Sequence, residues 1–274
     1  MTAFLCETCG VQHAPRADRP DEPPIACPIC LDERQYVGPK GQRWTTIERL
    51  RAERTNHLDE PEPNLLAVET RPGFAIGQRA LLVQTPAGNL LWDCTPLLDD
   101  AVVGAIQARG GVQAIAISHP HFYSAMVEWS RAFGGAPIWL HAADRAHVMR
   151  PDPAIRHWDG PTADPLPGSG LTLVNVGGHF DGQTALHWPA GAEGRGVLCS
   201  ADMPQVVADR RWVTFMYSYP NLIPLPTREV RRIADLLARY PFDRLYGGWT
   251  DRVVERDASA AVARSAARYV EHLG

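Results

Sequence analysis

Two histidines that directly follow a buried-looking strand constrain this chain more than any other feature. An apolar run, 114–117, ends at Ser118, and His119 and His121 come next. In an extended segment residues i and i+2 face the same side, so we expect both imidazoles to reach one metal ion at about 2.0–2.1 Å. The segment therefore predicts a metal site just past the carboxyl end of a strand.

Two more candidate ligands follow later strands. His179 comes after the apolar run that ends in Val176-Gly-Gly, and Asp202 comes just after the run 196–201. Three imidazoles and one carboxylate at strand ends suit a borderline metal such as zinc or iron.

The order of these elements resembles the metallo-β-lactamase superfamily. The matches are His119-x-His121 to the start of its H-x-H-x-D-H motif, Gly178-His179 to its second metal motif, Asp202 to its bridging aspartate, and Asp93 to its early strand-end aspartate. The resemblance covers about residues 62–274. It implies an α/β fold, a four-layer αββα sandwich, with the site along one edge of the paired sheets.

The chain departs from the family pattern at the second metal. The remaining Asp and His of the first motif fall at Tyr123 and Ser124, and the last family histidine falls within 247–249, where Trp249 stands. The resemblance implies that these positions hold the second ion in dinuclear members. We therefore expect one metal ion, held by His119, His121, His179 and Asp202. Asp93, Tyr123 and Trp249 are expected to surround the ligands without binding the metal.

The leading hypothesis is hydrolysis of a small-molecule substrate at one zinc ion. A water on the zinc, with its pKa lowered toward about 7, would attack an ester-, thioester-, amide- or phosphoester-like centre. Asp202, freed from bridging, is the candidate general base. Four protein ligands would fill a tetrahedral zinc, so water must enter as a fifth ligand or displace the carboxylate.

Two alternatives stay open. Two histidines and a carboxylate with open positions are the ligand set of mononuclear iron oxygenases. Persulfide dioxygenases of the superfamily resemble this arrangement at positions matching His119, His179 and Asp202. The other alternative is a lapsed hydrolase that binds a partner without catalysis, because kinship of fold spans many chemistries.

Four cysteines near the start form a separate pattern. Cys6, Cys9, Cys27 and Cys30 make two C-x-x-C pairs, a spacing typical of a zinc ribbon whose thiolates close a tetrahedral structural zinc site. The intervening loop is rich in proline and charge, so metal binding would supply the folding energy that it lacks. The alternatives are two disulfides or free thiols.

The pattern of apolar residues divides the chain into a zinc-ribbon-like module at 1–40, a helical linker at 41–61 and the main domain at 62–274. Strands are predicted at 65–69, 80–84, 89–92, 112–117, 137–140, 171–176, 184–188, 196–199 and 244–246. Helices are predicted at 44–54, 98–108, 125–133, 142–149, 228–239 and 257–273. We expect 151–170 to be a long surface loop, and one hypothesis is that the aromatic loop 217–221 lines a pocket.

Charge and hydropathy restrict the partners. The formal net charge of −4 and the pI near 6.2 give no electrostatic reason to expect a nucleic-acid or anionic-membrane partner. The sequence has no apolar stretch near the roughly 18 residues that span a bilayer and no visible targeting segment. We therefore expect a cytoplasmic protein, in which paired cysteines hold metal.

Overall fold

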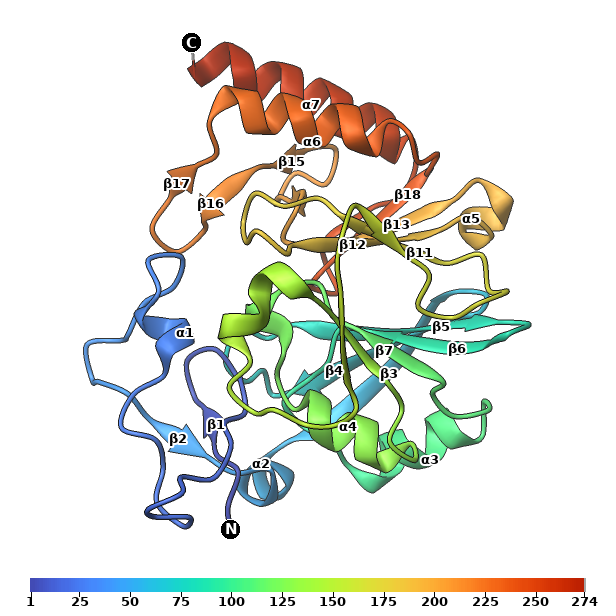
Figure 1. The fold of residues 1–274 in the computed structure, drawn as a ribbon. Helices are drawn as coiled ribbons and strands as arrows, with labels where there is room; N and C mark the ends of the chain where they lie inside the picture. The colour runs from blue at the N-terminus through green and yellow to red at the C-terminus, as the bar shows by residue number, and fades with distance from the viewer. Residues whose placement is uncertain (274) are drawn as a thin grey trace.

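The computed structural model describes residues 1–273, and its main body consists of two β-sheets between two layers of helices (Figure 1). The first sheet has seven strands in the order β3-β4-β5-β6-β7-β8-β9. They are β3 (Thr55–Glu62), β4 (Leu65–Arg71), β5 (Arg79–Thr85), β6 (Gly88–Trp92), β7 (Ala114–Ala116), β8 (Ile138–His141) and β9 (Ile155–Trp158). Strands β6 to β9 run parallel to one another, so their carboxyl ends lie along one edge.

The second sheet has six strands in the order β10-β11-β12-β13-β18-β19. They are β10 (Thr162–Ala163), β11 (Thr172–Asn175), β12 (Thr184–Trp188), β13 (Val197–Ala201), β18 (Arg244–Gly247) and β19 (Val253–Val254). Two small ribbons lie beside it: β14 (Gln205–Val206) with β15 (Val213–Thr214), and β16 (Met216–Ser218) with β17 (Ile223–Pro224). A four-residue helix, α5 (Gly191–Gly194), follows β12.

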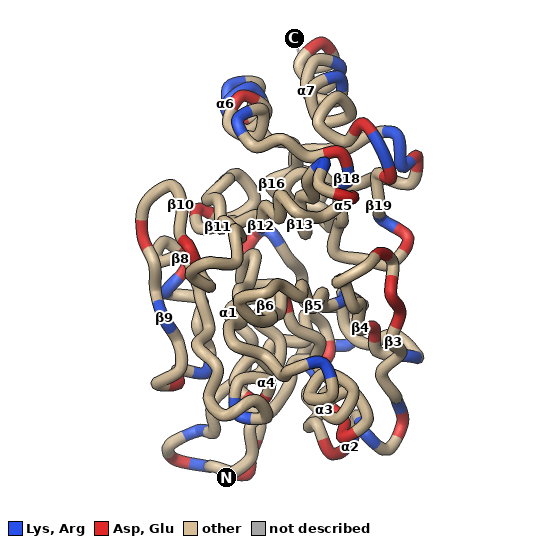
Figure 2. Tube along the Cα trace, turned by 90° about the vertical axis from the view of Figure 1, so that its right-hand side faces the viewer, with Lys and Arg blue, Asp and Glu red and all other residues tan. Residues whose placement is uncertain are grey.

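Helices cover the outer faces of the two sheets, as Figure 2 shows from the side. On the first sheet lie α2 (Ile47–Glu53), α3 (Asp100–Gln107) and α4 (Met126–Ala132), and on the second lie α6 (Thr227–Leu237) and α7 (Ala258–Leu273). The amphipathic pattern explains this placement: Val230, Ile233 and Leu237 of α6 recur at helical spacing and are all buried. The four-layer αββα arrangement that the resemblance implied is thus observed.

Successive side chains along a central strand belong to two different layers of the core. In β5, Leu81 and Val83 face the second sheet, whereas Ala80 and Leu82 face the helices. Side chains of a strand point alternately to opposite faces, so a strand that is apolar at every position is buried on both. This explains why the sequence predicted the central strands.

The N-terminal module, which we define as residues 1–45, surrounds the four cysteines. Its strands β1 (Leu5–Cys6) and β2 (Trp44–Thr45) pair antiparallel, and a short helix, α1 (Pro28–Leu31), carries Cys30. All four cysteines are buried and belong to the same apolar cluster as the helix-covered face of the first sheet. The module therefore packs on the main domain.

Three expectations about local structure need correction. The segment 41–61 is not only helical, because β3 starts at Thr55 and pairs with β4. The predicted loop 151–170 contains β9 and β10. The predicted helix at 142–149 is a 3-10 helix, Ala142–His147. Each of these segments is polar or interrupted by proline, so its residues carry little periodic apolar signal. The three-part division of the chain stays a prediction.

Within 1–273, every helix is too short or too polar to cross a bilayer.

Candidate metal centre

The histidine site, which we define as His119, His121, His179 and Asp202, forms where the two sheets meet at one edge. His119 and His121 follow β7, His179 lies in the turn between β11 and β12, and Asp202 follows β13. A hydrogen bond from Thr184 N to Ser118 O (2.8 Å) joins the sheets at this point. One ligand atom from each of the four residues lies within 4.8 Å of those of the others, and all four residues are buried.

Asp93 and Ser118 orient His119. The Ser118 hydroxyl donates to Asp93 Oδ1 (2.8 Å), and the Ser118 amide donates to the same oxygen (2.8 Å). Since its proton is given to Asp93, the hydroxyl accepts from His119 Nδ1 (3.0 Å). The proton of a neutral His119 therefore lies on Nδ1, and its Nε2 lone pair points into the site.

His121 reaches the site differently from the expectation. Pro120–Phe122 form a 3-10 turn rather than an extended segment, because Pro120 fixes a φ suited to a turn. The imidazole rings of His119 and His121 still lie 5.2 Å apart between centroids. The turn presents Nδ1 of His121, which lies 3.3 Å from Nε2 of His179. The two histidines do face one point, as predicted, but a 3-10 turn directs them there and not an extended segment.

The turn that carries His179 requires glycine. Gly177 and Gly178 have φ of 61° and 92°, and a Cβ on Gly178 would lie 2.9 Å from Leu225 Cδ1. His179 Nδ1 donates to the carbonyl of Tyr217 (2.7 Å). A carbonyl only accepts, so the proton of a neutral His179 lies on Nδ1 and its Nε2 lone pair also points inward.

Asp202 completes the group with one free oxygen. Its Oδ1 accepts from Gln205 Nε2 (2.9 Å). Its Oδ2 lies 3.3 Å from His119 Nε2 and 3.8 Å from His179 Nε2. The hydrogen-bond relays make both nitrogens acceptors, so three acceptors converge with no proton between them. Such an arrangement is repulsive unless a cation lies among them, and the donor set therefore fits a metal ion.

The protonation states agree with ligation. Burial lowers the pKa of His179 to about 4 and lowers that of His121 well below its usual value, with the neighbouring histidines adding to the effect. Burial raises the pKa of Asp202, but His119 and His179 lower it further, and the result is below the usual range. Neutral imidazoles and an ionised carboxylate are the forms that bind metal.

The predicted surrounding residues lie at different distances from the ligands. Asp93 acts through Ser118 as described, and burial raises its pKa to about 8. Trp249 packs edge-on against Phe122, with 6.0 Å between ring centroids, and the Phe122 ring lies 4.8 Å from that of His119. The indole nitrogen of Trp249 donates to the Ile76 carbonyl (2.8 Å). Trp249 is thus separated from the ligands by one ring.

Tyr123 and Ser124, at two positions of the absent second metal, face the N-terminal module. Tyr123 is buried beside Val11 of the module, and the carbonyl of Ser124 accepts from Gln12 N (3.0 Å). In residues 1–273, the histidine site and the four cysteines are the only groups of three or more metal-binding side chains.

The cysteine site, which we define as Cys6, Cys9, Cys27 and Cys30, has the spacing of a tetrahedral centre. The Sγ atoms are 3.5 Å apart for Cys6 and Cys30 and 3.7 Å apart for Cys9 and Cys27, and none of the four forms a disulfide. Sulfurs about 2.3 Å from one zinc lie roughly this far apart. The prediction of a zinc-ribbon-like group of four cysteines is confirmed, and the alternative of two disulfides is wrong.

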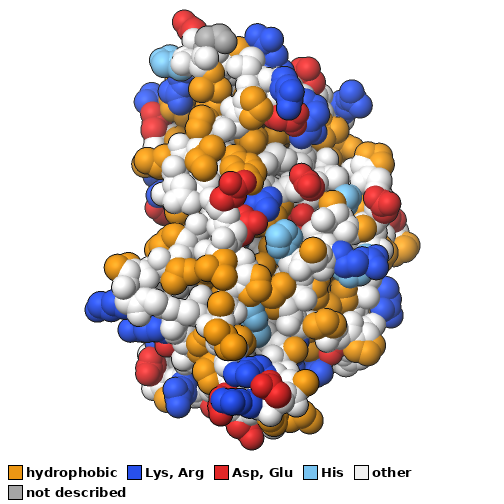
Figure 3. Space-filling view, turned by 60° about the vertical axis from the view of Figure 1, so that its left-hand side comes forward, with side chains coloured by type: hydrophobic (Ala, Val, Ile, Leu, Met, Phe, Trp, Pro, Cys, Tyr) orange, Lys and Arg blue, Asp and Glu red, His pale blue; other side chains and the backbone are white. Residues whose placement is uncertain are grey.

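Phe180 and Arg34 cover the histidine site. The ring of Phe180 lies 5.0 Å from His121 and from His179 between centroids, and the Arg34 guanidinium lies 4.0 Å above that ring. Acidic, basic and histidine side chains gather near the middle of the face that Figure 3 brings forward. The cover comes partly from the N-terminal module.

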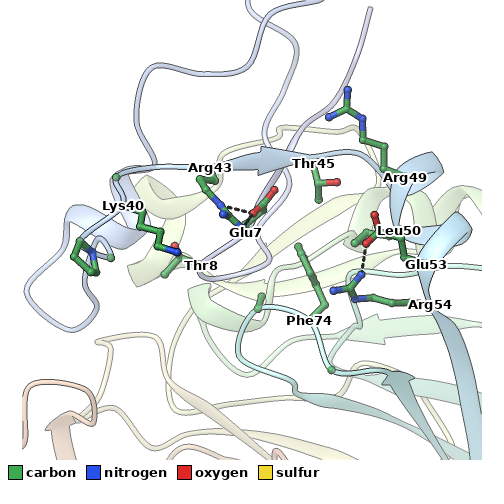
Figure 4. A pocket seen from close by; sticks show the side chains of 15 residues that line it. Glu7, Thr8, Lys40, Arg43, Thr45, Arg49, Leu50, Glu53, Arg54 and Phe74 are labelled. Carbon is green, nitrogen blue, oxygen red and sulfur yellow. Dashed lines mark hydrogen bonds and ion pairs between the residues drawn. The ribbon is translucent and has the colours of Figure 1, made fainter.

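A cavity of about 720 Å³ lies elsewhere, between the N-terminal module and α2 (Figure 4). Two ion pairs lie in its wall, Arg43 with Glu7 (2.6 Å) and Arg54 with Glu53 (2.7 Å), and Lys40 and Arg49 line it as well. No histidine-site ligand lines it, so its volume carries no argument about the chemistry.

Several contributors to the site were not predicted. They are Ser118, Asp144, Phe180, Gln205, Arg34 and the Tyr217 carbonyl. Asp144 accepts from Gly182 N (2.9 Å) and fixes the turn of His179, and a Cβ on Gly182 would lie 2.6 Å from Asp144 Oδ2. The only signals in the sequence were the position of Phe180 beside His179 and the aromatic loop that contains Tyr217.

Comparison with known proteins places this geometry in context. No family profile matches the chain. It is 48% identical over 275 residues to "Uncharacterized protein YmaE" of Bacillus subtilis (strain 168), covering 100% of this chain and 97% of that protein.

Solved structures resemble it more distantly. DIM-1 metallo-β-lactamase aligns with a TM-score of 0.60 at 15% identity, over 81% of this chain and 100% of the other. The flavodiiron core Flv1 of Synechocystis sp. PCC6803 aligns with a TM-score of 0.57 at 12% identity, over 80% of this chain and 61% of the other. At these identities the likeness shows the fold alone.

Proposed function

We propose that this chain, which belongs to the same family as YmaE of Bacillus subtilis, is a hydrolase with one zinc ion at the histidine site. The metallo-β-lactamase fold supports the proposal. The observation that carries this proposal is the convergence of His119 Nε2, His179 Nε2 and Asp202 Oδ2, with Oδ2 lying 3.3 Å and 3.8 Å from the two nitrogens. His121 Nδ1 is the fourth donor.

A zinc ion held there supplies a Lewis acid that polarises a substrate oxygen and lowers the pKa of water toward about 7. The chain's own part is to direct three imidazoles to one point and to fix the tautomer of two of them. Ser118 and the Tyr217 carbonyl do this for His119 and His179. Phe180, 1% exposed, keeps bulk water from the ligands and so strengthens electrostatic interactions among them.

Asp202 is proposed as the general base. Gln205 holds Oδ1, so only Oδ2 is directed into the site. For Oδ2 to act as a base, water would have to displace it from the ion, which the three imidazoles would still hold. Oδ2 would then accept one proton of the attacking water. The water oxygen would bond to the ester-, thioester-, amide- or phosphoester-like centre, the bond from that centre to the leaving group would break, and the proton would pass from Oδ2 to the leaving group.

The absence of a second metal group beside the histidine site among the described residues supports a mononuclear site. The cysteine site is proposed to hold a structural zinc, because four thiolates leave no open position.

Elemental analysis of the purified protein, together with a panel of chromogenic esters, thioesters and phosphoesters, tests the proposal. We expect about two zinc ions per chain, one at each site, and metal-dependent hydrolysis of one substrate class. Iron at the histidine site would contradict the proposal in favour of an oxygenase. A histidine site that binds no metal would contradict it in favour of a partner-binding protein.

A further inference from the structure

The segment 217–222, which comprises the end of β16 and the loop that leads to β17 and which we call the turn, is hydrogen-bonded to the N-terminal module. Asn221 Nδ2 donates to the carbonyls of Glu33 (2.8 Å) and Gln35 (3.1 Å). The Ser218 hydroxyl donates to the carbonyl of Arg34 (3.2 Å). Figure 1 shows the turn directly beside the module. The backbone of residues 33–35, which follows α1 and its Cys30, therefore sets the position of the turn.

The same turn also orients His179, one of the proposed metal ligands. Its Tyr217 carbonyl is the hydrogen-bond partner of His179 Nδ1 (2.7 Å) and fixes which nitrogen of His179 faces the site. Arg34 of the module makes a second link, because its Nη1 donates to the carbonyl of His179 (3.4 Å) and its guanidinium lies over Phe180. The module thus contacts the turn that carries the Tyr217 carbonyl and also contacts the backbone of His179 itself.

The turn is supported on one side by the main domain, where the Tyr219 hydroxyl donates to the Asp202 carbonyl and the Tyr219 ring lies 5.5 Å from that of His179. Strands β16 and β17 form an isolated two-stranded ribbon with a register shift, and Leu222 and Ile223 are 76% and 39% exposed. A two-stranded ribbon is marginally stable in water. The contacts with residues 33–35 therefore add a second set of contacts, on the side of the module, that helps to keep the Tyr217 carbonyl in place.

We propose that Asn221 and Ser218 are positioning residues through which the N-terminal module orients His179, so that the cysteine site and the histidine site are coupled. This inference rests on the proposed metal binding at the histidine site. A substitution that breaks the contacts between the turn and the module leaves all four histidine-site ligands in the chain but lowers the metal affinity of the site. Outer contacts of metal-ligating histidines typically change affinity about 10–100-fold.

The test uses the full-length chain with Co²⁺ as the probe. Asn221→Ala removes both hydrogen bonds to the module, and Leu222→Ala, at the exposed neighbour, is the matched control. For each variant, competition with a chelator gives the Co²⁺ affinity of the histidine site, and visible absorption reports its coordination geometry. Absorption from cobalt–thiolate bonds reports the cysteine site separately.

We expect Asn221→Ala to bind Co²⁺ at the histidine site about 10–100-fold more weakly, with a changed spectrum of that site and an unchanged thiolate signal. Ser218→Ala should shift the affinity in the same direction by less, and Leu222→Ala should match the wild type. Wild-type affinity and spectrum in both Asn221→Ala and Ser218→Ala would overturn the inference while leaving the proposed function intact. A wild-type chain that binds no Co²⁺ at its histidines would overturn the proposed function first.

Discussion

The two metal-binding groups of this chain are built in opposite ways. The cysteine site takes its ligands from one short stretch, in which Cys6 and Cys30 are 24 residues apart, and all its donors are thiols. The histidine site gathers ligands from three loops, with His121 and His179 58 residues apart, and each is held by a different segment. The first group needs only its own loop to form, whereas the second needs both sheets and the module.

This difference separates a structural role from a chemical one. Four thiolates close a tetrahedron and leave no position for a substrate. The histidine site includes a carboxylate, which water can displace from a metal more readily than a thiolate, and is covered by side chains, Phe180 and Arg34, that do not bind metal. Loss of histidine-site ligands should therefore leave the cysteine site intact, whereas loss of the cysteine site should also weaken metal binding at the histidine site.

The largest expected effect is the loss of metal from the histidine site. His119→Ala and His179→Ala each remove one of three converging acceptors, so we expect zinc to fall from about two ions per chain to about one. The exposed His272→Ala on α7 is the control. Mass spectrometry of the metal content, with circular dichroism to confirm folding, gives the result. Two zinc ions retained in both variants would show that these histidines are not ligands.

Loss of the cysteine site should release the other zinc. Because metal binding provides the folding energy of such a module, about 10–16 kcal/mol in zinc-finger peptides, Cys6→Ser with Cys27→Ser should unfold much of residues 1–45. We expect at least one zinc less per chain, weaker metal binding at the histidine site because the module orients His179, and rapid proteolysis within the module, while the sheets stay protected. A double variant with full zinc content and an intact module would contradict the structural role.

Asp202→Asn should separate chemistry from binding. The amide keeps the shape of the side chain but accepts a proton poorly, so turnover should fall about 100-fold or more. Metal content should fall less, since three imidazoles remain. The ratio of the two losses, from steady-state kinetics and metal analysis of the same sample, is the measurement. Equal losses would mean that Asp202 serves as a ligand only.

The smallest effect is expected one step away from the ligands. Ser118→Ala breaks the relay from Asp93 to His119, so metal affinity should fall about 10–100-fold while the fold is kept. Chelator competition measures the change. Thr95→Ser, at a buried hydroxyl that contacts Leu97 O instead, serves as the control. Wild-type affinity in Ser118→Ala would show that the relay does not orient His119.

The sequence predicted which four residues converge, but not the groups that orient them. His119, His121, His179 and Asp202 each follow an apolar strand, and strands of this kind are recognisable because they are buried on both faces. The Tyr217 carbonyl could not be predicted, because a backbone oxygen is the same in every residue and only the fold selects it. Strand β3 was missed because its segment, TNHLDEPE, is a largely exposed edge strand with few apolar residues.

Anomalous diffraction from crystals grown with excess zinc tests the central claim most directly. The account predicts one ion among His119, His121, His179 and Asp202 and one among the four cysteines, with Tyr123, Ser124 and Trp249 free of metal. A second ordered ion about 3.5–4 Å from the first, the usual separation of two-metal sites, would contradict both the mononuclear site and the role of Asp202 as base.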